Sequence, residues 1–151
     1  GCIYSARQPG TCDANWGANY LVHNAADGDT AIFPSLSRPP IDYYLVREPS
    51  GSPAISKTSY PAEIDTHPGY EGSVLAPTRQ AALKKEAEDL AAKLRAHGGR
   101  VFYFRGFHPE VDAHIDAAFG ASFQRDTAHS TECGTMPSYY NAVTVWTASA
   151  P

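Results

Sequence analysis

The strongest hydrophobic pattern in the chain lies between residues 78 and 97. Apolar side chains recur there at intervals of three and four positions: Leu83, Ala87, Leu90 and Leu94. This spacing lines one face of an α-helix, so the sequence predicts a long helix whose apolar stripe packs on a core. Thr78 is expected to cap the start of the helix, and Gly98-Gly99 to end it.

A period of two residues replaces the helical period at residues 100–107. Val, Phe and Tyr alternate there so that both faces of the segment carry aromatic rings, which predicts a central strand covered on both sides. Pro109 then opens a second, shorter helix that Gly120 ends. Two further strands are predicted after it, at residues 121–126 and 140–148.

The first half of the chain holds shorter runs, broken by Gly, Pro, Ser, Asn and Asp. Three of these runs are typical of short strands: residues 19–23, 30–33 and 41–48. Asp27-Gly28 predicts a hairpin turn between the first two. Residues 49–77 show no periodic pattern and are predicted to form an irregular surface connection.

These elements predict a single domain over residues 1–151, of the α+β or α/β class. Residues 1–76 would form its loop-rich β part, and residues 77–151 follow the order helix, strand, helix, strand, strand. The expected architecture is a mixed β-sheet with one long and one short helix packed on it.

Charge narrows the range of partners. The net charge is −4, and residues 1–76 carry four basic against eight acidic side chains, whereas residues 77–151 carry eight of each. A protein that binds nucleic acid by neutralising phosphates usually gathers a basic excess on one element, so nucleic acid is not the favoured partner. The chain contains no apolar run of about 18 residues, so no membrane span is expected.

Cysteine usage bears on the compartment. The chain has three cysteines, and Cys2 and Cys12 flank a Pro9-Gly10 turn signal that would bring their side chains together. This predicts a disulfide between them and a free thiol at Cys133. A disulfide implies an oxidising compartment, so a secreted or extracytoplasmic location is expected. The alternative is three free thiols in a cytosolic protein.

The first candidate site is the junction between the strand at 100–107 and the helix after it, where Arg105, Gly106 and His108 lie. The unpaired N–H groups at a helix N-terminus attract anions. Arg105 would bind a phosphate or carboxylate through two hydrogen bonds, Gly106 would let the ligand approach the backbone, and His108 would titrate near neutral pH. The alternative is that Arg105 pairs with an acidic neighbour and His108 only caps the helix.

A metal site at this junction is not predicted. His108 and Asp112 share a helix face, but His114 points about 200° away from Asp112 around the helix axis. The usual spacing of two histidines on one helical face is absent, as is a Cys-x2-Cys pair. Neither a metal ion nor another cofactor is therefore expected.

The second candidate site is the polar segment 125–137, which contains His129, Glu132 and Cys133. A histidine beside hydroxyls, a carboxylate and a thiol has the parts for acid–base chemistry, although this arrangement matches no known catalytic signature and is also typical of a plain turn. If the helix between them joins the strands at 100–107 and 121–126, the two strands run parallel. The segment would then flank the same cleft as Arg105.

The resulting hypothesis is a small hydrolase or group transferase that acts on a small anionic substrate, such as a phosphoester or nucleotide. Arg105 and Gly106 would bind the anion, His108 and His129 would form the acid–base pair, and Glu132 would orient one imidazole. A secreted or delivered toxin-like effector is one setting for such an enzyme. The alternative is an extracellular binding module with a tyrosine-rich surface: Tyr43, Tyr44, Tyr60, Tyr70, Tyr139 and Tyr140. The sequence leaves the oligomeric state open.

Overall fold

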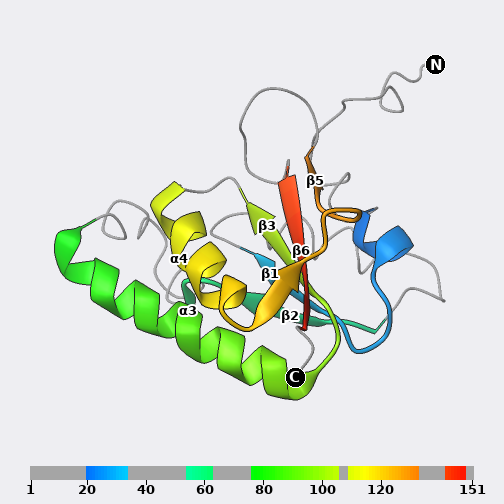
Figure 1. Cartoon of the computed structure of the whole chain (residues 1–151), viewed down its shortest axis with the longest axis horizontal. Helices are drawn as coiled ribbons and strands as arrows, with labels where there is room; N and C mark the ends of the chain where they lie inside the picture. Colours follow the sequence, from blue (N-terminus) through cyan, green and yellow to red (C-terminus); the bar gives the residue numbers. More distant parts are fainter. Residues whose placement is uncertain (1–19, 34–53, 63–75, 106–108, 133–141, 149–151) are drawn as a thin grey trace.

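The computed structural model describes five segments of the chain: residues 20–33, 54–62, 76–105, 109–132 and 142–148 (Figure 1). Its labelled elements follow one another in this order: β1 (Thr30–Phe33), β2 (Ser56–Ser59), α3 (Pro77–His97), β3 (Val101–Arg105), α4 (Pro109–Gly120), β4 (Phe123–Arg125), β5 (Thr131–Glu132) and β6 (Ala142–Ala148).

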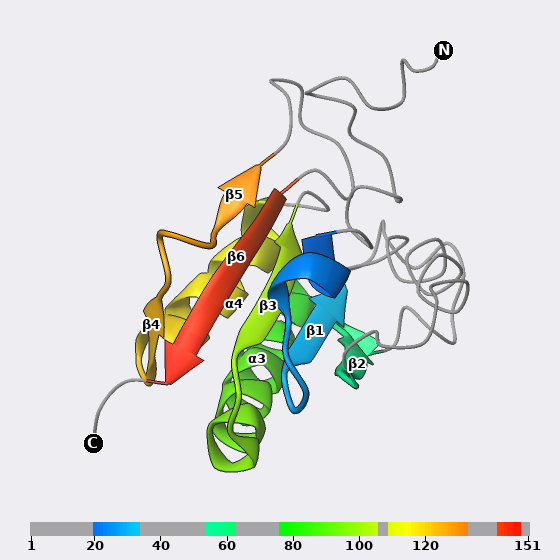
Figure 2. The same ribbon diagram turned by 90° about the vertical axis from the view of Figure 1, so that its right-hand side faces the viewer.

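The six strands form one mixed sheet. Its order is β2, β1, β3, β6, β4, and β5 pairs with β6 as well (Figure 2). β1 is parallel to β2 and β3, whereas β6 is antiparallel to β3, β4 and β5. β3 and β4 consequently run in the same direction on either side of β6. The mixed sheet with helices packed on it confirms the predicted α+β class.

α3 and α4 lie side by side on one face of the sheet (Figure 1). The predicted apolar stripe of α3 faces inward, and Leu83 and Ala87 are fully buried. α4 contributes its own buried stripe, which includes Val111, Ile115 and Phe119. Val101 and Tyr103 of β3 complete this cluster from the sheet side. Amphipathic helices and one face of β3 therefore make the larger core.

The ends of α3 differ in how well the sequence predicts them. The helix begins with Pro77 after Ala76, which provides no side-chain cap, so Thr78 is not the cap as predicted but lies inside the first turn. Proline suits that position because its φ is already helical and it has no N–H to satisfy. The glycine stop is confirmed, since the Gly98 N–H donates to the Leu94 carbonyl at 3.1 Å. Within the described segments, no helix is both long and apolar enough to cross a membrane.

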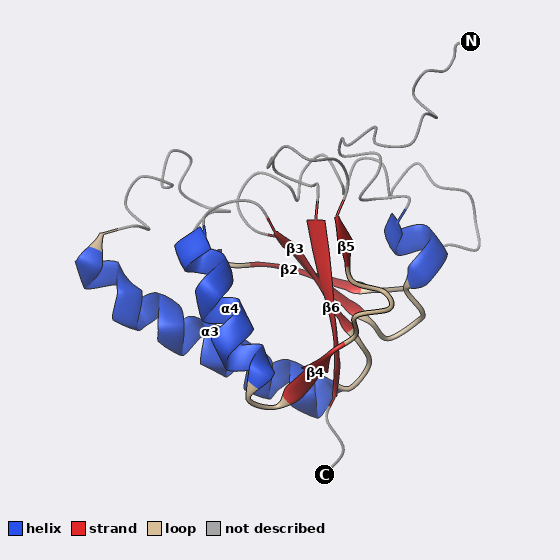
Figure 3. Ribbon diagram, turned by 45° about the horizontal axis from the view of Figure 1, so that its top comes forward, coloured by secondary structure: helices blue, strands red, loops and turns tan. Residues whose placement is uncertain are grey.

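Residues 20–24 form a short helix on the opposite face of the sheet (Figures 2 and 3). The strand predicted at residues 19–23 is therefore wrong. Leu21 is buried in a second cluster with Phe102 and Phe104 of β3, which confirms that both faces of β3 are covered. A short apolar run does not distinguish strand from helix by its periodicity, and packing on the sheet decides the outcome here.

The connections of β1 also differ from the prediction. β1 itself matches the strand predicted at residues 30–33, but both of its partners, β2 and β3, are parallel to it, so Asp27-Gly28 does not form a hairpin turn. β2 lies within residues 49–77, which were predicted to be irregular. Its sequence, SKTS, is polar and carries no strand pattern. The strand predicted at residues 41–48 lies outside the described residues.

The starts of β1 and β3 are held together by Asp29. Its buried carboxylate accepts the N–H of Ala26 at 2.8 Å, the N–H of Arg100 at 2.8 Å and the Arg100 guanidinium at 3.2 Å. Gly99 lies against the same junction with a φ of +81°, and a Cβ there would stand 2.4 Å from the carbonyl oxygen of Gly28. The two backbones can approach this closely only because residue 99 has no side chain.

Candidate functional site

A turn at residues 126–130 interrupts the edge of the sheet beside β6. β4 pairs with residues 146–148 and β5 with residues 142–143, so the turn stands opposite Val145. The Asp126 N–H donates to the Val145 carbonyl at 2.8 Å, and the Val145 N–H donates to Ser130 Oγ at 2.8 Å. Both ends of the turn are thus bound to one residue of a buried strand.

Within this turn, Asp126 holds the imidazole of His129. Asp126 Oδ2 lies 2.7 Å from His129 Nδ1, while Oδ1 accepts the backbone N–H groups of Ala128 at 3.0 Å and His129 at 3.1 Å. The aspartate side chain is 17% exposed and the histidine side chain 45% exposed. A fixed carboxylate therefore orients an imidazole that solvent can reach.

The electrostatics keep this aspartate ionised. Desolvation, the largest single effect on the carboxyl, would raise the pKa of Asp126, but the hydrogen bonds from the side chain and backbone of His129, with that from Ala128, together lower it. An ionised carboxylate can only accept, so Nδ1 of His129 carries the proton. In the neutral ring Nε2 is then a proton acceptor, as a general base requires.

Tyr20 ties the turn to the helix on the face of the sheet opposite α4. Its hydroxyl donates to the carbonyl of His129, and its ring stands edge-on to Phe102 with a centroid distance of 6.3 Å. Burial is the main cause that raises the pKa of Tyr20, the negative charge of Asp126 adds to it, and the positive charge of Arg100 opposes it. The phenol is therefore a fixed donor that supports the backbone of His129.

Arg105 is bound by a different element. Its Nη1 and Nη2 donate to the two carboxylate oxygens of Asp116 on α4 at 2.8 and 2.7 Å, and Nη1 also donates to Thr144 Oγ1 at 3.0 Å. Hydrogen bonding to Asp116 is the main cause that raises the pKa of Arg105. The acidic neighbour considered as the alternative for Arg105 is thus present, and it occupies the guanidinium face suited to an anion.

The side chains of Asp112 and His114 point in different directions and bind different elements. The Asp112 carboxylate, which is largely buried, accepts the hydroxyl of Tyr103 at 2.7 Å on the sheet side of α4. His114 Nε2 lies 2.8 Å from Gln80 Oε1 on α3. His108 and Gly106 lie outside the described residues. In the segments that the structure describes, no group of three or more His, Cys, Asp or Glu side chains could hold a metal ion.

The two candidate sites do not meet in one cleft among the described residues. β3 and β4 are parallel, as predicted, but β6 lies between them. Arg105 is held by α4 on one face of the sheet, whereas His129 is held by Tyr20 from the other face. Only the backbone of Glu132 is described. Glu132 and Arg105 pair with Ala142 from opposite sides. The Cα atoms of Glu132 and Arg105 are therefore about 10 Å apart, or two strand spacings.

Two residues at the turn were not assigned a role from the sequence. Asp126 stands three positions before His129, a spacing that a turn brings into contact, so the sequence did contain this signal. Tyr20 lies 109 positions away in the chain, and nothing in its local pattern indicates that contact. The partner that orients the imidazole of His129 in the structure is accordingly Asp126. The predicted role of Glu132, which is to orient one imidazole, stays a prediction.

One of the six tyrosines predicted to form a binding surface, Tyr60, does not lie on the surface. Tyr60 is completely buried, and its hydroxyl donates to the Leu83 carbonyl at 2.7 Å. It packs in the core beneath α3 and is not a surface contact, so its inclusion in that surface was wrong. The other five tyrosines lie outside the described residues: Tyr43, Tyr44, Tyr70, Tyr139 and Tyr140.

Comparison of the chain with family models, with curated proteins and with solved structures yields no match.

Proposed function

We propose that this protein is a small enzyme that hydrolyses or transfers a group on an anionic substrate by acid–base catalysis, with His129 as its proton acceptor. The observation that carries the proposal is the 2.7 Å contact between His129 Nδ1 and Asp126 Oδ2. A carboxylate in this position sets the tautomer of the ring and stabilises the imidazolium that forms when Nε2 takes a proton.

Proton movements follow from this arrangement. Nε2 of His129 would remove a proton from a water molecule or hydroxyl as that oxygen attacks the substrate, and the bond to the leaving group would break in the same reaction. His108 is proposed as the second acid–base group and would give a proton to the leaving group. Transfer of one proton from the His129 imidazolium to His108 through solvent would then restore both rings. Asp126 stays ionised throughout and acts as the positioning residue.

The anionic class of the substrate is proposed on the cationic side chain of Arg105. A planar guanidinium binds a phosphate or carboxylate through two parallel hydrogen bonds, as it does with Asp116 in the structure. A substrate anion at Arg105 would therefore replace Asp116. Because β6 separates Arg105 from the turn at residues 126–130, that anion would belong to a part of the substrate remote from the bond on which His129 acts. A phosphoester or nucleotide has the required charge and also offers a leaving group that needs a proton.

The test is a turnover screen with phosphodiesters, nucleotides, NAD and RNA. His129→Gln removes the base, and Asp126→Asn keeps the size of the side chain but favours the wrong ring tautomer. Each change is expected to lower kcat by about 10² to 10⁴. His97→Gln, at an exposed position in the last turn of α3, is the matched control and should leave turnover unchanged. Full activity in folded His129→Gln would refute the assignment, and no turnover by the wild type on any substrate would favour a binding role.

A further inference from the structure

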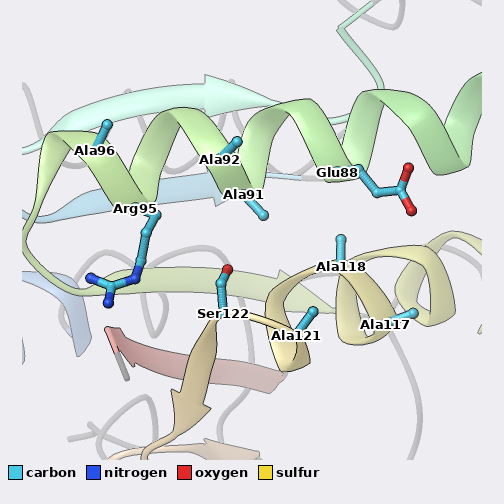
Figure 4. A pocket seen from close by; sticks show the side chains of 9 residues that line it. All are labelled: Glu88, Ala91, Ala92, Arg95, Ala96, Ala117, Ala118, Ala121 and Ser122. Atoms are coloured by element: carbon cyan, nitrogen blue, oxygen red, sulfur yellow. The ribbon is translucent and has the colours of Figure 1, made fainter. Parts of the chain in front are cut away.

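The outer surface between α3 and α4 carries a groove of about 550 Å³ (Figure 4). Six alanines form most of its lining: Ala91, Ala92, Ala96, Ala117, Ala118 and Ala121. Figure 4 shows Glu88 at one end of the groove and Arg95 at the other, both on α3. The groove is therefore apolar along its length and oppositely charged at its two ends.

The charged ends belong to one stripe of α3. Glu88, Ala92 and Arg95 are four and three residues apart, a spacing that aligns side chains along a helix. This stripe lies about 100° or more around the axis from the buried positions Leu83 and Leu94. Glu88 and Arg95 are separated by about 10.5 Å along the axis, and Ala92 with its neighbour Ala91 stands midway between them.

We propose that this groove is the interface of a symmetric homodimer in which α3 packs antiparallel to α3 of a second copy. A two-fold axis through the midpoint between Ala91 and Ala92 exchanges the two ends of the stripe. It places Glu88 of each copy opposite Arg95 of the other, so the favourable pair forms twice. A parallel arrangement would place Glu88 opposite Glu88, which selects against it.

The alanines suit a helix as the occupant of the groove. Methyl side chains allow helix axes to approach at the short end of the usual 8–10 Å range. Alanine also loses no side-chain rotamer freedom when it is buried. Ala92, Ala96, Ala117 and Ala121 are exposed in the single chain, so apolar surface remains to be covered. The second copy supplies matching alanines from the same stripe.

The intrachain partner of Glu88 is compatible with this interface. Glu88 already binds Lys84 at 3.0 Å, but the two side chains are 52% and 65% exposed. A carboxylate has two oxygens and accepts more than one donor. Arg95 has an intrachain interaction of its own, but its guanidinium carries five N–H donors. Arg95 of the second copy can therefore approach the same carboxylate without displacing the lysine. The turn at residues 126–130 takes no part in the contact, so the dimer is independent of the proposed activity.

The first test measures the mass of the full chain in solution by sedimentation velocity over a wide concentration range. The wild type should shift from monomer to dimer as concentration rises. Glu88→Arg places arginine opposite arginine twice, and Arg95→Glu places glutamate opposite glutamate. Each single variant should raise the dissociation constant of the dimer by about tenfold or more. A wild type that stays monomeric at every concentration overturns the proposal.

The second test mixes the two charge variants. A Glu88→Arg chain and an Arg95→Glu chain complement each other at both ends of the antiparallel interface, so native mass spectrometry should find the heterodimer in excess over either homodimer. Lys85→Glu and Asp89→Arg reverse an exposed pair farther round the helix, and mixing these controls should produce no such excess. A wild-type dimer whose charge variants behave like the controls would show that another surface is used and would overturn the proposal.

Discussion

Arg105 and Asp116 join β3 to α4 through two parallel hydrogen bonds of 2.8 and 2.7 Å. The aspartate is 44% exposed and the arginine 24% exposed, so the pair lies at the boundary between core and solvent. Because the carboxylate fills the guanidinium fork, any anionic ligand of Arg105 competes with a group of the protein itself.

This competition predicts the effect of Asp116→Asn. If Arg105 binds the anion of the substrate, loss of the competing charge should lower KM by about fivefold, the equivalent of roughly 1 kcal/mol for a partly exposed pair. Arg105→Lys should raise KM, because lysine lacks the planar fork. Steady-state kinetics on both variants decides the matter, and an unchanged KM in both would leave Arg105 as a structural residue only.

The two glycines after α3 form a matched pair for a stability test. Both have positive φ, but a Cβ at Gly98 would meet nothing within 4 Å, whereas one at Gly99 would stand 2.4 Å from the Gly28 carbonyl oxygen. Gly98→Ala should therefore cost about 1–3 kcal/mol of unfolding free energy from backbone strain alone. Gly99→Ala should cost about 1–3 kcal/mol more, because the backbones must also separate. Equal losses in urea denaturation would mean that the close approach adds nothing.

The lowered pKa of Asp126 predicts how stability changes in acid. The ionised carboxylate is favoured in the folded chain, so its contribution is complete above the unfolded aspartate pKa of about 3.9 and is lost as the pH falls through the lower folded value. The Tm of the wild type should accordingly fall more steeply below about pH 4 than that of Asp126→Asn. Asp89→Asn, the same chemical change on the exposed face of α3, serves as control. Parallel curves for the wild type and Asp126→Asn would contradict the assigned cause.

The oxidation state of the cysteines tests the predicted secreted or extracytoplasmic location of the protein. All three cysteines lie outside the described residues. The predicted Cys2–Cys12 disulfide leaves Cys133 as the single thiol that an alkylating reagent can modify. Mass spectrometry of the unreduced protein should then find one modified cysteine and, after reduction, three. Three modified cysteines without reduction would remove the argument for a secreted or extracytoplasmic location.

The elements that the sequence predicted well are those whose periodicity matches their packing. The apolar stripe of α3 and the two aromatic faces of β3 are both present in the structure because burial requires the same spacing that the pattern shows. The elements that the sequence predicted wrongly are those whose structure depends on a partner distant in the chain. β2 is polar and becomes a strand by pairing with β1, and residues 20–24 become a helix by covering Phe102 and Phe104.

In the candidate site, too, contacts within one turn could be predicted from the sequence, whereas contacts between distant segments could not. The polar cluster around His129 made it a candidate, and the spacing of three residues contained the signal for Asp126, because their contact is made within one turn. The expected approach of Arg105 to His129 depended on strand order, which no local pattern encodes. The sequence indicated correctly that β3 and β4 are parallel, but it did not indicate that β6 lies between them. The roles of His108 and Glu132 in catalysis remain predictions.

β6 is the last described element along the chain, yet it lies in the interior of the sheet between β3 and β4. During synthesis on the ribosome, β1, β2, β3, α3 and α4 emerge before it and can begin to pack. The peptide group of Val145, to which Asp126 and Ser130 bind, emerges only later. The turn that carries His129 is therefore attached to the sheet only after residues 142–148 have left the ribosomal tunnel, when most of the larger core is already available for folding.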